Sequence, residues 1–223
     1  MAELVDHAET LLTEFNSWRM LHRRGLRWKQ EQFLEMEASS SRIRIFQPAL
    51  VPGLLQTSEY ARQVLARADV TGSGDADDAV STRMKRQWIL HDPGKTFEFV
   101  ITEAALRWRF ASPPAMAIQA EYVQSMSRLD NVTIRVIPFS AEIPLIPYNS
   151  FCIFDDKAVT LETFSAEMHV REPRDVALYA TAFDTLKAAA GDEAETRALL
   201  GVIVEDLATP GMSIGEREVA MVD

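Results

Sequence analysis

Apolar side chains recur at three- and four-residue steps at the start of the chain, which is the period of an amphipathic helix. The positions are Leu4, Ala8, Leu11, Leu12, Phe15 and Trp18. We expect this helix to end near Gly25, because glycine commonly terminates helices. A second helix is predicted over residues 28–39, with Phe33 and Met36 turned inward. The pattern therefore predicts a helical hairpin.

Two prolines and a glycine interrupt the apolar run FQPALVPGLLQTSEYARQVL, which covers residues 46–65. Pro48 and Pro52 fix their own φ angles and favour extended geometry in the residues before them, so residues 47–53 are predicted to cross the molecule without forming a helix. Thr57 then offers an N-cap oxygen to a following helix. That helix is predicted to bury Tyr60, Ala61, Val64, Leu65 and Ala68.

A period of two marks the predicted strands. SRIRIF at residues 41–46 alternates isoleucine with arginine, which predicts a strand with one face exposed to solvent. TFEFVI at 96–101 and NVTIRVIPF at 131–139 alternate in the same way, and two helical stretches, 102–109 and 114–128, lie between them. The centre is therefore a predicted β-α-α-β unit. Its inward side chains, with those of the first strand, are Ile43, Ile45, Phe97, Phe99, Ile101, Val132, Ile134 and Val136.

The stretch TGSGDADD at residues 71–78 is the clearest predicted loop. Its acidic residues suit the start of the next helix, because the positive end of a helix dipole favours negative charge. That helix is predicted to turn Val80, Met84 and Trp88 inward and to end by His91.

Three short alternating segments follow in the second half of the chain, FCIF, AVTLET and EMHV, and their tight connections predict an antiparallel meander. After Pro173 the helical period returns. Its positions are Val176, Tyr179, Ala180, Phe183, Leu186 and Ala190, and then Leu199, Leu200 and Ile203. We expect an α+β fold, with a central, mostly antiparallel sheet flanked by helices. The predicted parts are the hairpin at 1–40, an α+β body at 41–207 and a loose tail at 208–223.

The composition is that of a globular chain: 47% of its 223 residues are hydrophobic, and no apolar run approaches the roughly 18 residues that a membrane span needs. Glu3, Asp6 and Glu9 occupy positions where a signal peptide would carry Lys or Arg, so we expect a cytoplasmic protein. Cys152 is the single cysteine, which excludes an intrachain disulfide. Its neighbours in SFCIF favour a buried strand residue over a reactive thiol.

The formal net charge is −10, whereas a protein that neutralises phosphates carries a surplus of Lys and Arg. We therefore expect no specific DNA binding by this chain alone. One basic cluster lies in RMLHRRGLRWK, at Arg19, Arg23, Arg24, Arg27 and Lys29. Its simpler interpretation is a solvated corner between two helices, balanced by the acids around it, and a contact with nucleic acid is the alternative.

The chain contains no P-loop, GxGxxG, HExxH, GxSxG or CxxC pattern. The four histidines are scattered: His7, His22, His91 and His169. None has a second His or Cys at metal-ligand spacing, so we expect no metal site, and we expect no cofactor. His169 in EMHV is predicted to face an interior beside Glu167 or Glu162. This pattern is compatible with a satisfied structural histidine and with a catalytic one.

Glu103 follows the strand FEFVIT directly, at a strand end where pockets tend to open. Arg107 lies four residues later on the same helix face, which makes an ion pair natural. Two interpretations are open: a local salt bridge at a helix start, or the polar floor of a pocket. The walls of that pocket would be Phe99, Trp108, Phe139 and Phe151.

Glu162 in VTLET is a further candidate, and its burial would require a partner such as Arg44 or Arg107. Catalytic candidates, if the chain carries any chemistry, are Glu103 and His169. The predicted ligand-binding residues are Arg44, Phe99, Glu103, Arg107, Trp108, Phe139, Phe151 and Glu162.

Several segments, taken in series, resemble one known family. The series is VPGLLQT followed by YA, then RMKRQWIL, FEFVITEAALRW, NVTIRVIPF, and FCIF with VTLET. It resembles the C-terminal domain of actinobacterial XRE-type helix-turn-helix regulators, a domain of unknown function whose family is described as antitoxin-like. The likeness extends from about Leu11 to Leu207.

Two departures from that family qualify the resemblance. A DNA-binding helix-turn-helix usually precedes the domain, whereas here nothing precedes Met1, so we expect either an excised domain or a natural version without the DNA reader. The family also has a glycine shortly after its VxPF strand, whereas PFSAEIPLIPYNSF has none, so we expect a reshaped loop there. The resemblance implies that residues 47–53 couple the first helices to the sensing body.

The favoured hypothesis is a binding module without chemistry, the effector and dimerisation domain of a regulator. It would recognise a small-molecule ligand or, as the resemblance implies, a small partner protein encoded nearby. We expect a homodimer, through a surface that includes Leu4, Leu11 and Phe15. The alternative hypothesis is a stand-alone enzyme, a cofactor-free cyclase or isomerase of specialised metabolism that uses the same pocket. A structural scaffold is the third.

Overall fold

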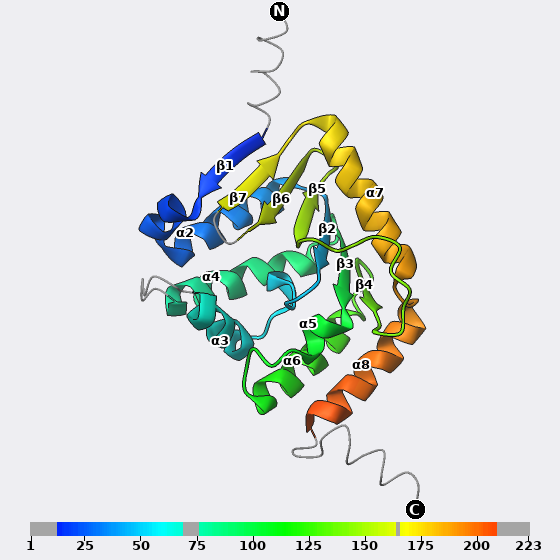
Figure 1. The fold of residues 1–223 in the computed structure, drawn as a ribbon. Coiled ribbons are helices and arrows are strands. Elements are labelled where there is room, and N and C mark those ends of the chain that lie inside the picture. The colour runs from blue at the N-terminus through cyan, green and yellow to red at the C-terminus, as the bar shows by residue number, and fades with distance from the viewer. Residues whose placement is uncertain (1–12, 69–75, 164–165, 209–223) are drawn as a thin grey trace, which may run out of the picture.

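The computed structural model of the chain describes residues 13–68, 76–163 and 166–208, and before Gln30 it describes only the side chain of Arg27. One sheet of seven strands organises these residues, in the order β1-β7-β6-β5-β2-β3-β4 (Figure 1). The β2–β3 and β3–β4 pairs are parallel, and the other neighbours are antiparallel. The predicted fold class, α+β with a mostly antiparallel sheet flanked by helices, is confirmed.

The elements follow one another along the chain as Figure 1 shows. The strands are β1 (Thr13–Ser17), β2 (Arg42–Gln47), β3 (Thr96–Thr102), β4 (Val132–Ile137), β5 (Phe151–Phe154), β6 (Ala158–Glu162) and β7 (Ala166–Val170). The helices are α2 (Trp18–Ser39), α3 (Ser58–Ala68), α4 (Ala76–Arg86), α5 (Glu103–Arg107), α6 (Pro113–Met126), α7 (Pro173–Ala189) and α8 (Glu193–Ala208), with 3-10 turns η1 (Gly53–Leu55) and η2 (Gln87–His91). The predicted β-α-α-β centre and the β5-β6-β7 meander are both confirmed.

The predicted break at Gly25 is wrong. Residues 13–17 form β1, which pairs antiparallel with β7, and a single helix, α2, then runs from Trp18 to Ser39. One glycine inside a helix costs only about 1 kcal/mol relative to alanine, which a helix of 22 residues tolerates. Pairing with the edge of the meander outweighs the helical period of residues 13–17. Residues 1–12, including Leu4 and Leu11 of the predicted first helix, lie outside the described part.

Helices cover both faces of the sheet (Figure 1). Because successive side chains of a strand point to opposite faces, Ile45 and Phe46 belong to different cores. The core that contains Ile45 is closed by apolar residues of α2, α3, α6 and α8. The core that contains Phe46 is closed by α7, through Val176, Phe183 and Leu186. The isoleucines and phenylalanines that the strands were predicted to turn inward are all buried: Ile43, Ile45, Phe97, Phe99, Ile101 and Ile134.

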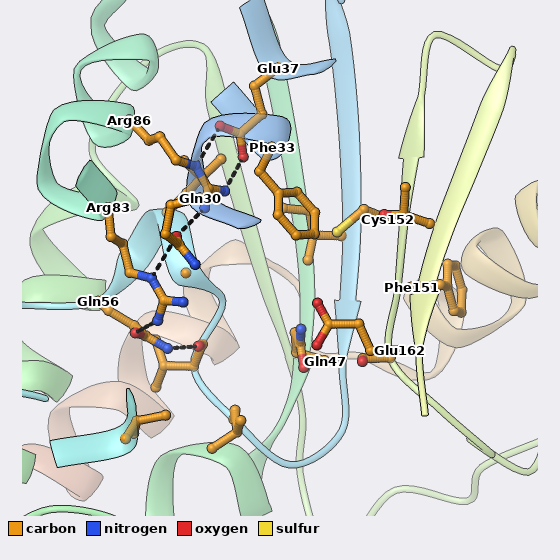
Figure 2. A pocket seen from close by; sticks show the side chains of 18 of the residues that line it. Gln30, Phe33, Glu37, Gln47, Gln56, Arg83, Arg86, Phe151, Cys152 and Glu162 are labelled. Carbon is orange, nitrogen blue, oxygen red and sulfur yellow. Dashed lines mark hydrogen bonds and ion pairs between the residues drawn. The ribbon is translucent and has the colours of Figure 1, made fainter. Parts of the chain in front are cut away.

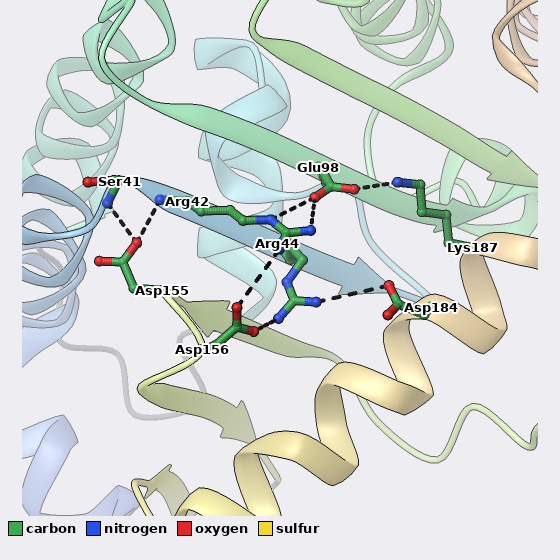
Figure 3. Close-up of polar contacts among 8 residues, drawn as sticks. All are labelled: Ser41, Arg42, Arg44, Glu98, Asp155, Asp156, Asp184 and Lys187. Atoms are coloured by element: carbon green, nitrogen blue, oxygen red, sulfur yellow. Dashed lines mark hydrogen bonds and ion pairs between the residues drawn. The ribbon is translucent and has the colours of Figure 1, made fainter.

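The prediction that β2 has one wet face is wrong at Arg44, which is only 3% exposed. Helix α7 covers this face of the sheet, and Arg44 lies beneath it. The Arg44 guanidinium pairs with Asp156 and lies 4.0 Å from Asp184 (Figure 3). Its central carbon also lies 5.6 Å from the centre of the Phe183 ring. The charge is therefore buried together with its partners, as buried charges require.

Trp88 was predicted to face inward, but it is 75% exposed. The α-helical period ends at Arg86, and the chain continues as the 3-10 turn η2. The tighter winding rotates the side chains after Arg86 away from the stripe that buries Ala79 and Val80. Within the described ranges no helix is both long and apolar enough to cross a membrane. The predicted tail lies outside the described residues from 209 onward.

Candidate functional site

A cavity of about 180 Å³ lies between α2, α3 and α4 on one side and the sheet face of β2, β5 and β6 on the other. The crossing segment after β2 closes one end. The helices and the crossing segment contribute Gln30, Phe33, Glu37, Leu50, Val51, Gly53, Leu54, Gln56, Val64, Leu65, Ala68, Arg83 and Arg86. The strand side contributes Ile45, Gln47, Ser150, Phe151, Cys152, Thr160, Leu161 and Glu162.

The crossing segment takes the extended course that its prolines predict, and glutamine side chains hold it in place. The Gln56 amide donates to the Val51 carbonyl at 2.7 Å, and Gln87 donates to the carbonyls of Gly53 and Gln56 at 3.1 and 2.5 Å. A loop of this kind leaves backbone carbonyls without ladder partners, and these amides satisfy them. The predicted cap is also confirmed, because Thr57 Oγ1 accepts from the Tyr60 amide at 3.4 Å.

Arg86 and Glu37 form a buried ion pair at the back of the cavity (Figure 2). Arg86 donates from Nε and Nη2 to the two Glu37 oxygens, at 3.0 and 2.5 Å, and the side chains are only 6% and 2% exposed. Arg86 Nη1 donates to Gln30 Oε1 at 2.5 Å, and the Phe33 ring lies against the guanidinium at 4.9 Å. This bidentate geometry is favourable for a buried ion pair, and it joins α4 to α2.

Arg83, one turn earlier on α4, has different partners. Its Nε donates to Gln30 Oε1 at 3.1 Å and its Nη1 to Gln56 Oε1 at 2.5 Å, so both acceptors are neutral amides. The remaining terminal nitrogen points into the cavity (Figure 2). Burial, and after it the positive charge of Arg86, lowers the pKa of the Arg83 guanidinium to about 10, so the group stays charged at neutral pH. Arg83 is within ion-pair distance of no carboxylate in the described part of the chain.

The opposite wall carries Glu162, Gln47, Cys152 and Thr160, and Figure 2 shows Glu162 facing the cavity beside Gln47. Burial, and after it the charges of Glu37 and Glu162, raises the pKa of the Cys152 thiol to about 12. The thiol is therefore protonated at neutral pH and a poor nucleophile. This agrees with the prediction that Cys152 is a strand residue rather than a reactive thiol.

Glu103 and Arg107 form the predicted ion pair, with Arg107 Nε 2.5 Å from Glu103 Oε1. The other Glu103 oxygen accepts from the Phe139 backbone amide at 2.9 Å, and Arg107 also binds Asp206 at 2.9 Å. Both carboxylate oxygens of Glu103 are thus engaged, one with Arg107 within α5 and the other with the segment that follows β4. Of the two interpretations from the sequence, the local salt bridge matches this geometry.

The predicted convergence of aromatic side chains on Glu103 is wrong. Phe99 and Phe151 are buried in different cores, on opposite faces of the sheet. Trp108 and Phe139 are exposed. Alternation along paired strands decides this outcome: Ile45 pairs with Phe99, whereas its neighbour Phe46 pairs with Phe151.

Two of the predicted ligand-binding residues line the cavity, Phe151 and Glu162. Glu162 is exposed, so the burial that would have required Arg44 or Arg107 as a partner does not occur. Arg44 pairs with Asp156 and Asp184 beneath α7, and Arg107 pairs with Glu103 and Asp206. The Glu162 charge raises the pKa of Arg83, against the larger lowering by burial and by the charge of Arg86.

His169 is buried, as predicted, and its Nε2 lies 2.8 Å from a Glu167 oxygen. Thr160 pairs with His169 in the sheet, so both side chains stand on the same face. His169 lines a second cavity, of about 220 Å³, together with Met36, Ser40, Asp155 and Arg171. Over the described ranges no group of three or more His, Cys, Asp or Glu side chains is placed to hold a metal ion.

Sequence reasoning missed Gln30, Gln56, Arg83 and Arg86 as lining residues. None belongs to a known catalytic motif, and amide side chains give no periodic signal. Their signal lay in the segments that carry the family resemblance: Gln56 stands in VPGLLQT, and Arg83 and Arg86 stand in RMKRQWIL.

Comparisons with solved structures give distant similarities. NucT from Helicobacter pylori is 8% identical, with a TM-score of 0.45 over 81% of this chain and 98% of that chain. A phospholipase D family member, Nuc from Salmonella typhimurium, is 11% identical, with a TM-score of 0.46 over 81% and 96%. TrmBL2, an archaeal chromatin protein, is 13% identical, with a TM-score of 0.41 over 86% and 60%. Similarities this weak say nothing about ligand or activity.

A search of curated proteins finds no match. The sequence profile of one family matches residues 30–201, a range that begins with Gln30 in α2 and ends inside α8. The matched range includes the whole lining of the cavity and all strands except β1. The chain belongs to the family described as Domain of unknown function (DUF5753).

Proposed function

We propose that this chain is a ligand-binding effector domain and that its ligand occupies the cavity between α2, α3, α4 and the sheet. Arg83 is the observation that carries the proposal. Its guanidinium is charged, is held in place by Gln30 and Gln56, and directs its remaining terminal nitrogen into the cavity. The buried carboxylate on this wall, Glu37, already accepts hydrogen bonds from Nε and Nη2 of Arg86.

A guanidinium held by neutral amides retains the ability to bind an anionic or carbonyl oxygen. Its N–H groups form shorter and stronger hydrogen bonds with a charged acceptor than with an amide. Partial exclusion of water from the cavity strengthens that bond further, because the effective dielectric constant falls. Small-molecule sites characteristically combine an apolar lining with a few polar groups of this kind.

The size of the cavity limits the ligand. An apolar cavity of about 150 Å³ is known to accept benzene, so a cavity of about 180 Å³ accommodates a single ring or a molecule of amino-acid size. Phe33, Leu50, Leu54 and Val64 supply apolar contacts on the helix side. A small molecule is therefore favoured over a segment of a partner protein as the occupant.

The wider setting of the domain stays a prediction from the sequence. That prediction includes its origin in an XRE-type regulator, a partner protein of the antitoxin type, the absence of specific DNA binding and the homodimer. Phe15 of the predicted dimer surface lies in β1, at the edge of the sheet. Light scattering tests the dimer, because the monomer mass is 25.1 kDa. A DNA titration at physiological salt tests the expected absence of specific DNA binding.

Ligand-detected NMR with a library of small fragments tests the proposed function. We expect saturable binding to the wild-type chain that Leu50→Trp abolishes, because Leu50 is a partly buried lining residue and tryptophan fills the space. Leu34→Trp is the matched control, since Leu34 is exposed on α2 and does not line the cavity. Binding of no fragment, or equal binding by Leu50→Trp and the wild type, would contradict the proposal.

A further inference from the structure

The partly buried guanidinium of Arg83 is held by two neutral amides. Its Nε donates to Gln30 Oε1 at 3.1 Å, and its Nη1 donates to Gln56 Oε1 at 2.5 Å. We propose that the ligand is a small monocarboxylic acid with an apolar body. Its carboxylate accepts from Arg83, and its body occupies the apolar middle of the cavity. This inference rests on the proposed function and narrows the ligand to one chemical class.

The Arg83 guanidinium retains donors for a carboxylate. An arginine side chain has five N–H groups, and Gln30 and Gln56 accept from two of them. The remaining terminal nitrogen is directed into the cavity (Figure 2). Gln30 Oε1 also accepts from Arg86 at 2.5 Å, so a second contact fixes this acceptor. A carboxylate therefore meets a guanidinium whose orientation is set before binding, which reduces the entropy lost on binding.

The charges on the helix side of the cavity favour a single negative charge on the ligand. Arg86 and Glu37 neutralise each other through two hydrogen bonds, which leaves the positive charge of Arg83 on this wall. A carboxylate forms a stronger hydrogen bond with this guanidinium than a neutral amide does. An ammonium group would be repelled by it. A second carboxylate on the ligand would lie against apolar walls, which is unfavourable for a charge without a partner.

Glu162 has no part in this binding mode. It stands at the end of β6, across the cavity from Arg83 in Figure 2, and its side chain is exposed. Water therefore hydrates this carboxylate and screens its charge. Its effect on the pKa of Arg83 is smaller than the opposite effects of burial and of Arg86. An acid bound at Arg83 consequently has no need to displace the water around Glu162.

The middle of the cavity is apolar. Phe33 of α2, Leu50 and Leu54 of the crossing segment, and Val64 and Leu65 of α3 line it. The volume of about 180 Å³ accommodates a single ring or a short branched chain, and a long fatty chain exceeds it. The class therefore comprises monocyclic aromatic acids and short branched-chain acids.

Calorimetric titration with two matched sets of probes tests this class on the unmodified protein. One set is benzoate, benzamide and benzylamine, and the other is isovalerate, isovaleramide and isoamylamine. Within each set the apolar body is kept and the end group is negative, neutral or positive. We expect at least one acid to bind, and its amide to bind about tenfold more weakly, because a charge-assisted hydrogen bond becomes a neutral one. The amine should bind more weakly still.

Inorganic phosphate is titrated in parallel, because it carries negative charge without an apolar body. We expect it to bind more weakly than the acid, since it gains nothing from the apolar middle of the cavity. Equal binding of phosphate and the acid would mean that the cavity recognises charge alone.

Two variants locate the ends of the ligand. Arg83→Gln should lower the affinity for the acid to that for its amide, and Leu50→Trp should abolish binding of both. Lys85→Gln is the matched control for Arg83→Gln, because it removes one exposed positive charge of α4 outside the cavity lining. Circular dichroism and the melting temperature show whether each variant is folded. The probe sets on the wild type are independent of that outcome.

The results separate this inference from the proposed function. If fragments bind in the cavity but the acids bind no more tightly than their amides, or no more tightly than phosphate, the monocarboxylate class is wrong and the binding domain stands. The same holds if Arg83→Gln keeps the preference for the acid. If neither fragments nor acids bind, both proposals fail. A preference for the acid that Arg83→Gln removes and Lys85→Gln retains supports the inference.

Discussion

Two groups of arginines lie on opposite faces of the same sheet, and they differ in their partners. Beneath α7, Arg42 and Arg44 of β2 are both paired with carboxylates (Figure 3). Beside the cavity, Arg86 is paired in the same way, whereas Arg83 binds only amide oxygens among the described side chains (Figure 2). The comparison separates arginines that hold the fold together from the one that we propose for ligand binding.

The group beneath α7 is a complete network. Glu98 of β3 accepts from Arg42 at 3.0 and 2.7 Å and also from Lys187 of α7. Asp155, in the turn between β5 and β6, accepts from the backbone amides of Ser41 and Arg42 at 2.9 and 2.8 Å. Its φ of 50° lies in the left-handed region that aspartate tolerates better than most residues. These contacts tie β2 to β3, β3 to α7, and β2 to the β5–β6 turn, so the network serves the fold.

The largest loss of stability is expected from breaking the Glu37–Arg86 ion pair, which is more buried than the ion pairs beneath α7. Glu37→Ala leaves the Arg86 charge buried without its carboxylate, so we expect the free energy of unfolding to fall by about 3–5 kcal/mol. Urea denaturation followed by circular dichroism measures this loss. Glu31→Ala on the same helix is the control: its pair with Arg27 is exposed, and we expect a change below about 1 kcal/mol. A loss below about 1 kcal/mol for Glu37→Ala would show that the pair does not join α2 to α4.

A smaller loss is expected beneath α7. Arg44→Gln removes a buried guanidinium, but its partners Asp156 and Asp184 are 53% and 69% exposed and can be rehydrated. We therefore expect a loss of about 1–3 kcal/mol in the same denaturation experiment. Arg174→Gln, at an exposed position of α7, is the control and should change little. A loss as large as that of Glu37→Ala would mean that exposure of the partners does not moderate the effect.

The smallest expected effect is on the stability of the protein at acidic pH. Burial alone would raise the pKa of Glu98, but the hydrogen bonds from Lys187 and Arg42 outweigh it and lower the pKa below the ordinary 4.5. The stability that Glu98 provides is therefore present above about pH 4.5 and is lost as the pH falls through its lowered pKa. We expect Glu98→Gln to flatten the decline in melting temperature below that pH. An unchanged acid profile would show that the network beneath α7 does not depend on the Glu98 charge.

The sheet could be predicted from the sequence because its strands alternate strongly and carry β-branched or aromatic residues at inward positions. β5, β6 and β7 were predictable for the same reason. β1 was not, because residues 13–17 follow a helical period and become a strand only through pairing with β7. The burial of Arg44 was not predictable either, since it depends on α7, which lies far away in the sequence and covers an apparently wet face.

Of the cavity lining, the sequence predicted Phe151 and Glu162. The sequence could not place Arg83 opposite to Glu162, because α4 and β6 come together only in the folded chain. Glu103 was also a reasonable choice, and the structure places it in a salt bridge with both oxygens engaged. Local patterns identify polar residues near apolar ones, whereas the partners that decide their role are set by tertiary packing.

The central claim is that Arg83 binds a ligand and Arg44 does not. Calorimetric titration of the tightest-binding small molecule into Arg83→Gln and Arg44→Gln tests it most directly, because each variant removes one partly or fully buried guanidinium, on opposite faces of the same sheet. We predict that Arg83→Gln weakens binding by about tenfold or more, through the loss of one charged hydrogen bond, while Arg44→Gln binds within about threefold of the wild type despite its lower stability. Equal affinity of Arg83→Gln and the wild type, or an equal loss in both variants, would contradict the account.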